Sequence, residues 1–307
     1  MNEKRDSLWE SWNRKLDFLT KVNDNELRFH VGFLYLLGTP IESDYWRAKN
    51  FVSGNYGSGL TMLNEYEILT EAVPANFWLS EPDPNAQEFS IPKILDDNPD
   101  VCLYLNKDIL RTQVDVTNMY KFGILEQVKS IIEVGGGYGQ LAASFSRILP
   151  KIKYTIVDLP AQLNIQKRWL SYIGLDVGYS SENQITLISS EDLNSCELTC
   201  DLMINVNSFC EMEESEIKKY IDGERIVFKW LYSNNREIQF MNIGLSKPLS
   251  EMFSKYFRLS PSLNSYKASE LVFTKYVFLG GELDLINELT PEEIHGVVSF
   301  NNQFEVN

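Results

Sequence analysis

Two acids frame a glycine-rich stretch near the middle of the chain. Glu133 comes just before the glycines Gly135, Gly137 and Gly139, and Asp158 stands 21 residues after Gly137. Because these positions lack side chains, the backbone can turn sharply and a ligand can lie against it. An acid about 20 residues beyond such a turn accepts hydrogen bonds from ribose hydroxyls in nucleotide-binding folds, and these bonds are charge-assisted. The spacing therefore predicts a nucleoside site.

The stretch departs from the dinucleotide fingerprint G-x-G-x-x-G. Counted from Gly135 the third glycine falls at Gln140, and counted from Gly136 the second falls at Tyr138. An NAD site would therefore lack the glycine that packs helix against strand. An acid directly before the turn repels a pyrophosphate but suits an ammonium or a sulfonium. Glu133 thus favours S-adenosylmethionine as the ligand. The alternatives are NAD binding and a glycine turn that serves only for packing.

Short runs rich in Ile and Val alternate with helical patterns from about residue 121 onward. The runs SIIEVGG, YTIVDL, ITLIS, DLMINV and RIVFKW are separated by segments such as LAASFSRIL and LNIQKRWLSYI. This alternation predicts parallel strands with crossover helices, and hence an α/β fold with a doubly wound, mostly parallel, seven-stranded sheet. Runs at 256–260 and 271–279 predict two of the strands as an antiparallel pair at one edge.

Residues 1–125 have a different sequence pattern, in which aromatic-rich helical segments are interrupted by glycine and proline. We predict a mainly helical N-terminal region with irregular loops at 54–59 and 81–99. A ligand-binding core at 126–280 and a C-terminal tail at 281–307 would follow. The aromatic side chains of the N-terminal region form either a lid over a sugar or ordinary packing. They are Trp9, Trp12, Tyr45, Trp46, Phe51 and Tyr56.

The chain resembles the class I S-adenosylmethionine-dependent methyltransferases, and within them the bacterial sugar O-methyltransferases. The resemblance covers residues 107–240 and rests on EVGGGYGQLA with VDLP, on DLMINVNSFCEM, on LYSNNR and on LRTQVDVTNMY. It implies a role in cofactor binding for Glu133 (ammonium), Gly135, Gly137 and Gly139 (methionine moiety and ribose), Asp158 (ribose), Ser190 and Glu191 (adenine) and Arg111 (carboxylate). For Arg111, an i,i+4 pair with Asp115 is the alternative.

Polar side chains at the carboxyl ends of the fourth and fifth predicted strands mark the acceptor side, since open α/β sheets bind ligands there. The candidates are Asn207, Ser208, Glu211, Asn234 and Asn235. Methyl transfer is an in-line displacement that depends first on alignment, and a general base adds about 10²–10⁴-fold. We expect Glu211 to be that base and Asn207 and Asn234 to orient the hydroxyl. A Glu211 that only caps the following helix is the alternative.

Composition narrows the choice of partners. With 28 basic and 43 acidic side chains, the net charge of -15 repels nucleic acid and anionic membranes. No run is long and apolar enough to span a bilayer, and the four cysteines suit a reducing compartment, so we expect a cytoplasmic protein. Cys196 and Cys200 have no further ligands at zinc spacing, so no metal site is expected. His30 is expected in packing and His295 at the surface.

The observations and the resemblance together predict an O-methyltransferase that transfers a methyl group from S-adenosylmethionine to a hydroxyl of a sugar or sugar-containing acceptor. The expected partner is a small-molecule or glycan acceptor, with neither nucleic acid nor membrane, and a homo-oligomer is left open. The alternatives are a methyltransferase for a peptide or small-molecule natural product, and a protein that binds a nucleoside without catalysis. The side chains of Asn207, Glu211 and Asn234 separate these two classes, because a catalytic site needs them turned toward the ligand.

Overall fold

The computed structural model describes residues 18–30, 59–71, 73–88, 90–95, 98–222, 225–235, 249–253, 259–261, 267–268, 271–272 and 276–278. The chain forms two compact units. Unit 1 comprises Met1–Thr117 and Gly136–Ser190, and unit 2 comprises Asn118–Gly135 and Glu191–Asn307. Each unit is described by itself.

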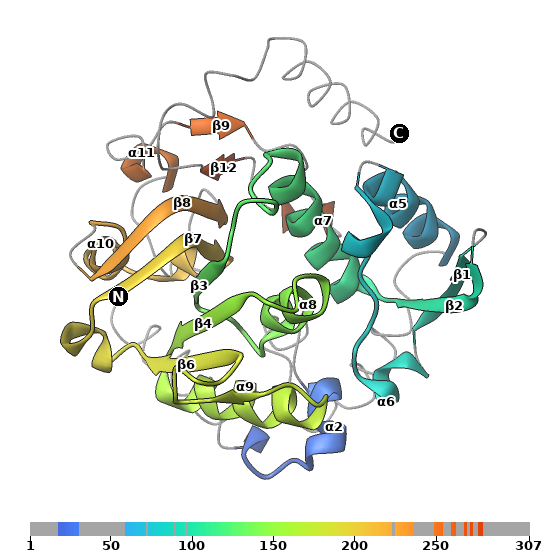
Figure 1. Cartoon of the computed structure of the whole chain (residues 1–307), viewed down its shortest axis with the longest axis horizontal. Helices are drawn as coiled ribbons and strands as arrows, with labels where there is room; N and C mark the ends of the chain where they lie inside the picture. The colour runs from blue at the N-terminus through green and yellow to red at the C-terminus, as the bar shows by residue number, and fades with distance from the viewer. Residues whose placement is uncertain are drawn as a thin grey trace. The chain divides into compact units, whose positions relative to one another are not determined.

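Unit 1 contains three parallel strands in the order β5 (Val177–Gly178), β6 (Ile185–Ser189) and β4 (Lys153–Asp158). Helix α9 (Pro160–Tyr172) connects β4 to β5 and contacts all three strands; Figure 1 shows it running beside β6. Proline suits the first position of α9, because its missing N–H would have no helical partner there. This is the strand-helix-strand unit that the sequence predicts.

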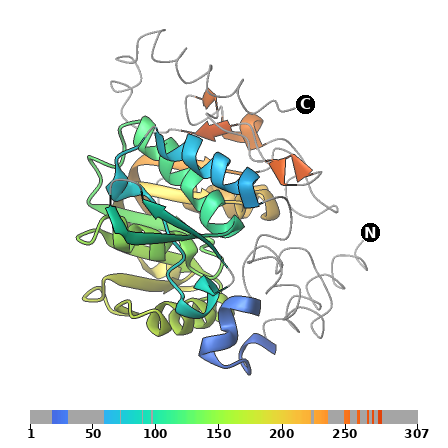
Figure 2. The same ribbon diagram turned by 90° about the vertical axis from the view of Figure 1, so that its right-hand side faces the viewer.

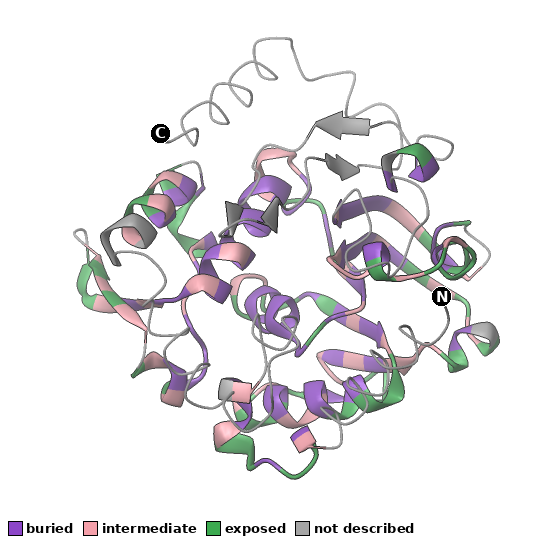
Figure 3. Ribbon diagram, turned by 180° about the vertical axis from the view of Figure 1, so that it is seen from behind, coloured by how far each residue is buried: buried purple, intermediate pink, exposed green. Residues whose placement is uncertain are grey.

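Helix α8 (Gln140–Ile148) follows the glycine turn directly. Its first seven residues are all buried, and Figure 3 shows most of the helix in purple. A helix that is buried all round needs small side chains where its neighbours approach, and Ala142 and Ala143 supply them. The helix therefore holds the end of the glycine turn in a fixed place within unit 1.

The N-terminal part of unit 1 contains α2 (Asp24–His30), α5 (Gly59–Glu71), the short η1 (Ala75–Phe77) and the first part of α7 (Lys107–Lys121). Helices α5 and α7 lie side by side in Figure 2, and Thr117 Oγ1 donates to Leu69 O at 3.3 Å. Asn106 begins α7, because its Oδ1 accepts from Ile109 N at 3.0 Å. The predicted helical character is therefore confirmed for these segments.

The prediction of an irregular loop at 81–99 is wrong. The structure places a one-turn helix, α6 (Pro84–Gln87), and strand β1 (Ile91–Leu95) in it. Strand β1 pairs antiparallel with β2 (Asn98–Leu105). Both strands of a two-stranded sheet are edge strands, and an edge strand accommodates a proline whose missing N–H faces away from its partner. The prolines of this segment therefore do not prevent a hairpin.

Unit 2 contains five strands in the order β3 (Ser130–Val134), β7 (Leu198–Val206), β8 (Ile226–Asn234), β12 (Tyr276–Phe278) and β9 (Leu259–Pro261). The first three are parallel, whereas β12 is antiparallel to both β8 and β9. This confirms the predicted reversed pair at an edge. Asp201 fixes the start of β3, since its Oδ2 accepts from Lys129 N at 2.8 Å and Ser130 N at 3.1 Å.

The remaining elements of unit 2 are short. They are η2 (Asp192–Ser195), η3 (Phe209–Glu211), α10 (Glu214–Ile221), α11 (Leu249–Phe253) and the pair β10 (Lys267–Ala268) and β11 (Leu271–Val272). The two units confirm a doubly wound, mostly parallel α/β fold. The three strands of unit 1 and the five of unit 2 make eight, one more than the predicted seven.

Several predictions fall on residues outside the described ranges. These are the six aromatic side chains of the possible lid, the tail at 281–307, His295 and the loop at 54–59 except for Gly59, which begins α5. The division at residues 125 and 280 stays a prediction. His30 is half-buried at the end of α2, and its ring lies edge-on to Phe18 at 5.3 Å between centroids.

Candidate active site

The part of the glycine turn that belongs to unit 1 is tied to Asp158 by one glutamine. Gly137 has a φ of 57°, and its carbonyl oxygen accepts from the amides of Gln162 and Gln166, the latter at 2.9 Å. The same Gln166 amide donates to Asp158 Oδ2 at 2.7 Å. A Cβ added to Gly137 would meet no described atom within 4 Å. The turn is therefore held from the α9 side, with open space beside Gly137.

Asp158 ends strand β4, as predicted, and its carboxylate is rich in hydrogen bonds. Oδ1 accepts from Leu159 N at 2.8 Å. Burial raises the pKa of Asp158 to about 6, although bonds from Gln166 and from backbone N–H groups, including that of Gly136, partly offset this effect. The group is mostly ionised at pH 7, so it can accept hydrogen bonds from a vicinal diol.

The position where a dinucleotide site would need a glycine holds a buried polar side chain instead. Gln140 Oε1 accepts from Tyr138 Oη at 2.9 Å, and its amide lies 3.4 Å from Ser144 Oγ. Close packing falls instead to Gly139, where an added Cβ would lie 3.0 Å from Leu170 Cδ1. Gly139 thus lies against α9, a contact that the sequence pattern did not reveal.

In unit 2, the residue before the last one of strand β3 is the buried Glu133, which is 2% exposed. Two residues later, Gly135 has a φ of 74°, and a Cβ added to it would lie 2.0 Å from Ser208 Oγ. Ser208 was predicted on the acceptor side, and the structure brings it directly against the glycine. Glycine is required here both by the backbone conformation and by this contact.

A cluster of asparagines joins the ends of β3, β7 and β8 in unit 2. Asn205 Nδ2 donates to Val134 O at 2.7 Å, and Asn205 Oδ1 accepts from Phe209 N at 2.9 Å. Asn235 Nδ2 donates to Asn205 Oδ1 at 2.8 Å and to Ser233 Oγ at 2.7 Å. Asn235, a predicted acceptor residue, is therefore engaged in holding the strand ends.

Asn207 differs from its neighbours in two ways. Its φ of 55° makes it the one non-glycine residue of the described chain with a positive φ, a conformation that asparagine tolerates better than most residues. Its N–H donates to Asn234 O at 2.9 Å, so two predicted residues lie side by side. Its Oδ1 is buried and accepts from no described group. A strained residue with an unused acceptor is a candidate ligand contact.

The other predicted residues lie as follows. Glu211 is exposed at the end of η3, and α10 begins only at Glu214, so Glu211 does not cap that helix. Ser190 is half-buried after β6, and its N–H donates to Asp158 O at 2.9 Å, whereas Glu191 is exposed. Arg111 is half-buried on α7. Their roles stay predictions.

Sequence reasoning missed Gln162, Gln166 and Asn205. The two glutamines are four residues apart just after VDLP, a spacing that puts both on one helix face. That spacing was a usable signal. Asn205 lies inside the apolar run DLMINV, where its position within a strand was the only cue.

One protein family matches a part of the chain. Residues 93–178 match the family described as the O-methyltransferase domain. The match contains the turn from Gly136 to Gly139 and also Asp158. It covers less than a third of the chain, so the activity of the whole protein is inferred below.

Two curated relatives come from Oryza sativa subsp. japonica. The chain is 40% identical over 50 residues to acetylserotonin O-methyltransferase 2 and 36% identical over 50 residues to acetylserotonin O-methyltransferase 3. In each case the match covers 16% of this chain and 14% of the relative. The chain therefore aligns with only a small part of the relatives it matches.

Solved structures show weaker likenesses. An O-methyltransferase family protein from Burkholderia thailandensis is 10% identical with a TM-score of 0.38, covering 73% of this chain and 70% of that one. Human N-acetylserotonin methyltransferase in complex with SAM is 14% identical with a TM-score of 0.36, covering 56% of this chain and 54% of that one.

Two kinds of feature are missing from the part of the chain that the structure describes. None of the helices in this part combines the length and the apolar character needed to cross a bilayer. Within the same residues, no group of three or more His, Cys, Asp or Glu side chains is arranged to hold a metal ion. All four cysteines are free thiols.

Proposed function

We propose that this protein is an S-adenosylmethionine-dependent O-methyltransferase that acts on a hydroxyl of a sugar or sugar-containing acceptor. One observation carries the proposal: within the stretch that matches an O-methyltransferase domain, Gln166 joins the Gly137 carbonyl to the Asp158 carboxylate. This arrangement fixes a left-handed turn and a ribose-binding acid relative to each other. A bare turn used only for packing has no need of that connection.

The residues present fit the proposed cofactor. Open space beside Gly137 admits a ligand, and the ionised Asp158 can accept from both ribose hydroxyls. Glu133 supplies negative charge, which suits the ammonium group and repels a pyrophosphate. When bound, S-adenosylmethionine supplies a methyl group activated by its sulfonium. The chain's own contribution is to orient the nucleoside and to favour positive charge near the turn.

The acceptor side is assigned to the strand ends of unit 2. Asn207 has a buried Oδ1 that accepts from no described group, and a hydroxyl is a donor of the right size to satisfy it. Asn234, bonded to Asn207 through the backbone, would orient the same acceptor, and the exposed Glu211 would take its proton. Amide and carboxylate groups suit a polyol better than an apolar ring, which supports a sugar.

A first experiment tests the cofactor. Isothermal calorimetry with S-adenosylhomocysteine should show micromolar binding to the wild-type protein and a loss of affinity of at least about tenfold in Asp158→Ala, because charge-assisted bonds are removed. NADH serves as the control and should not bind. Binding of NADH alone would reject the proposal, since it would mean that the glycine turn belongs to a dinucleotide site.

A second candidate is methyl transfer to a small aromatic alcohol, favoured by the match to the two acetylserotonin O-methyltransferases. A screen for methylated product should include nucleotide sugars, free sugars, a hydroxyindole and a short hydroxyl-bearing peptide. Product from the sugars but not from the other acceptors supports the proposed acceptor, and the reverse supports the second candidate. Binding of S-adenosylhomocysteine without turnover on any acceptor would favour the non-catalytic alternative.

The role of Glu211 has its own test. If Glu211 is the general base, Glu211→Gln should lower kcat by about 10²–10⁴-fold while leaving S-adenosylhomocysteine affinity unchanged. Glu213→Gln is the matched control, because Glu213 is also exposed and lies two residues away. Near wild-type turnover of Glu211→Gln removes Glu211 from the mechanism and leaves the cofactor assignment intact.

A further inference from the structure

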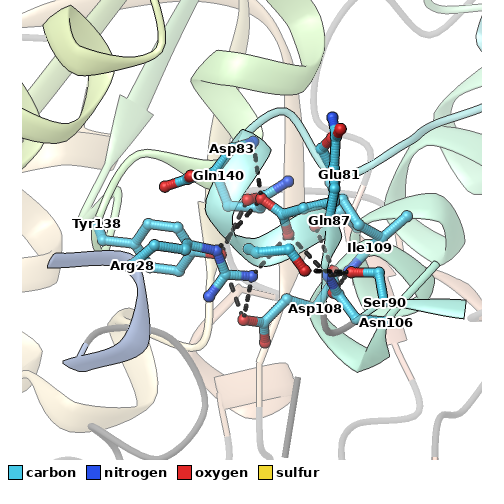
Figure 4. A network of polar contacts seen from close by, with 12 residues as sticks. Arg28, Glu81, Asp83, Gln87, Ser90, Asn106, Asp108, Ile109, Tyr138 and Gln140 are labelled. Carbon is cyan, nitrogen blue, oxygen red and sulfur yellow. Dashed lines mark hydrogen bonds and ion pairs between the residues drawn. The ribbon is translucent and has the colours of Figure 1, made fainter. Parts of the chain in front are cut away.

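An arginine from the N-terminal part of unit 1 lies buried against the glycine turn. Arg28, on α2, is fully buried, and its guanidinium carbon lies 4.9 Å from the centre of the Tyr138 ring. Figure 4 shows its guanidinium among Tyr138, Glu81 and Asp108. Arg28 Nη2 lies 3.0 Å from Glu81 Oε2 and 3.0 Å from Asp108 Oδ2. A full positive charge therefore lies beside the middle residue of the G-Y-G sequence.

This guanidinium is not fully used. Arg28 Nε and Nη2 donate to Glu81, but Nη1 is buried and has no hydrogen-bond partner among the described residues. An unpaired donor on a buried charged group is costly, and native structures rarely leave one without a reason. Burial disfavours the charged form, but attraction to Glu81 and Asp108 outweighs it and raises the pKa of Arg28. Arg28 therefore stays positively charged, and its unpaired Nη1 is a charged hydrogen-bond donor.

The two carboxylates that contact Arg28 differ in how many hydrogen bonds they accept. Both oxygens of Glu81 are engaged, since Oε1 accepts from Asp83 N at 3.1 Å and Oε2 from Asn106 Nδ2 at 2.7 Å. Asp108 Oδ2 lies 3.3 Å from Tyr138 Oη, but no hydrogen bond to Asp108 Oδ1 is found within the described chain. An unused cationic donor and an unused anionic acceptor thus belong to two side chains that touch each other.

The charge balance limits what can bind there. Glu81, Asp83 and Asp108 are all buried around one guanidinium, so the cluster carries more acids than bases. A simple anion would satisfy Nη1 but would add negative charge beside three carboxyl groups. A simple cation would satisfy Asp108 and leave Nη1 unpaired. A ligand that carries a carboxylate and an ammonium on the same carbon atom satisfies both, and an α-amino acid group has this chemistry.

We propose that Arg28 and Asp108 bind the amino-acid end of the cofactor, with Arg28 Nη1 donating to its carboxylate and Asp108 Oδ1 accepting from its ammonium. The inference rests on the proposed use of S-adenosylmethionine. It transfers to Arg28 the role that the resemblance implied for Arg111, and to Asp108 the direct contact with the ammonium that the resemblance implied for Glu133. It also gives the N-terminal region of unit 1 a direct part in choosing the ligand: nucleosides without an amino-acid group bind less well.

The experiment compares two ligands that differ in one group. Calorimetry on the full chain uses S-adenosylhomocysteine and its decarboxylated analogue, S-adenosyl-3-thiopropylamine. The wild-type protein should prefer S-adenosylhomocysteine by about 10–100-fold, the range of a hydrogen bond between charged groups. In Arg28→Gln the preference should fall to about one, through a loss of S-adenosylhomocysteine affinity alone. Arg111→Gln should keep the wild-type preference.

A matched control separates ligand binding from the anchoring of α2. Arg168 also ties this part of the chain to α9, donating to Asp24 Oδ1 at 2.8 Å and to Leu19 O at 2.7 Å, but no such contact joins it to the glycine turn. Arg168→Gln should lower the melting temperature without changing the ratio of the two affinities. If Arg28→Gln weakens both ligands equally, as a purely structural variant would, the proposal is overturned.

The wild-type protein alone decides the matter if Arg28→Gln does not fold. Equal affinity of the wild-type protein for the two ligands rejects the role of Arg28 while leaving the cofactor assignment standing. Failure of the wild-type protein to bind either ligand rejects the cofactor and, with it, this inference. A wild-type preference of at least tenfold, together with a loss of affinity for both amine-bearing ligands in Asp108→Asn, supports the pairing of Asp108 with the ammonium.

Discussion

Gly135 and Gly137 have similar backbone conformations in different surroundings. Their φ angles are 74° and 57°. A Cβ on Gly135 would collide with Ser208 inside unit 2, whereas a Cβ on Gly137, in unit 1, would meet no described atom within 4 Å. The pattern G-x-G-x-G treats the two alike. In the structure the first lies against Ser208 and the second has open space beside it, so equal motif positions have different surroundings.

The largest effect is expected for Gly135→Ala. Strain at a positive φ and overpacking against Ser208 each cost about 1–3 kcal/mol, so we expect a loss of about 2–6 kcal/mol in the free energy of unfolding, measured in urea. Gly123→Ala is the matched control, since Gly123 has a φ of 68° and open space around it. It should lose only about 1 kcal/mol. Equal losses would show that Ser208 yields easily.

Gly137→Ala should affect binding more than folding. Its left-handed φ costs about 1 kcal/mol of stability, as in Gly123→Ala. The new methyl group occupies the space assigned to the ligand, so the affinity for S-adenosylhomocysteine should fall about 10–100-fold, as for an overpacked contact of about 1–3 kcal/mol. Unchanged affinity, measured by calorimetry, would show that the open side of Gly137 does not face the cofactor.

Gln166→Met tests what holds the Gly137 carbonyl. The change removes bonds to Gly137 O and to Asp158 within unit 1, and we expect a loss of about 2 kcal/mol in unfolding free energy. Gln127→Met is the control, because the exposed Gln127 amide donates to Gly123 O at 3.1 Å in the same way. It should change stability by less than about 0.5 kcal/mol. Similar losses in both variants would show that the bonds of Gln166 contribute no more to stability than those of an exposed glutamine.

The smallest effect is expected from pH acting on Asp158. Because burial raises its pKa in the folded protein from 3.8 to about 6, this group favours the folded state below about pH 4 and loses that contribution as the pH rises through 6. S-adenosylhomocysteine affinity should move the other way, falling about tenfold from pH 7 to pH 5 as the carboxylate is protonated. Asp158→Asn is the control and should lack both trends. If stability and affinity instead changed with pH in the same direction, relative to this control, the assignment of Asp158 to the ligand site would be contradicted.

Much of the fold could be predicted because local signals agreed with it. The apolar runs that end at Val134 and Asp158 are strands, and the late pair that became β9 and β12 does run antiparallel. The hairpin of β1 and β2 could not be predicted, since Pro92 marks a loop in most contexts and is tolerated here only because β1 is an edge strand.

The candidate site was only partly predictable. The acid at 158 and the glycines could be found because both follow from spacing along the chain. Arg28 could not, because its partner Glu81 lies 53 residues away and Asp108 lies 80 residues away. Nothing in the local sequence LRFH distinguishes a buried guanidinium from an exposed one. Contacts between distant segments decide which charges are buried, and a single sequence does not reveal them.

Both outermost strands are short. The two-residue β5 lies at the end of the strand order in unit 1, and the three-residue β9, which ends in Pro261, lies at the end of the order in unit 2. Short edges offer few free N–H and C=O groups to a neighbouring molecule, and a proline removes one donor. Strand-to-strand stacking between copies is thereby discouraged at these two edges.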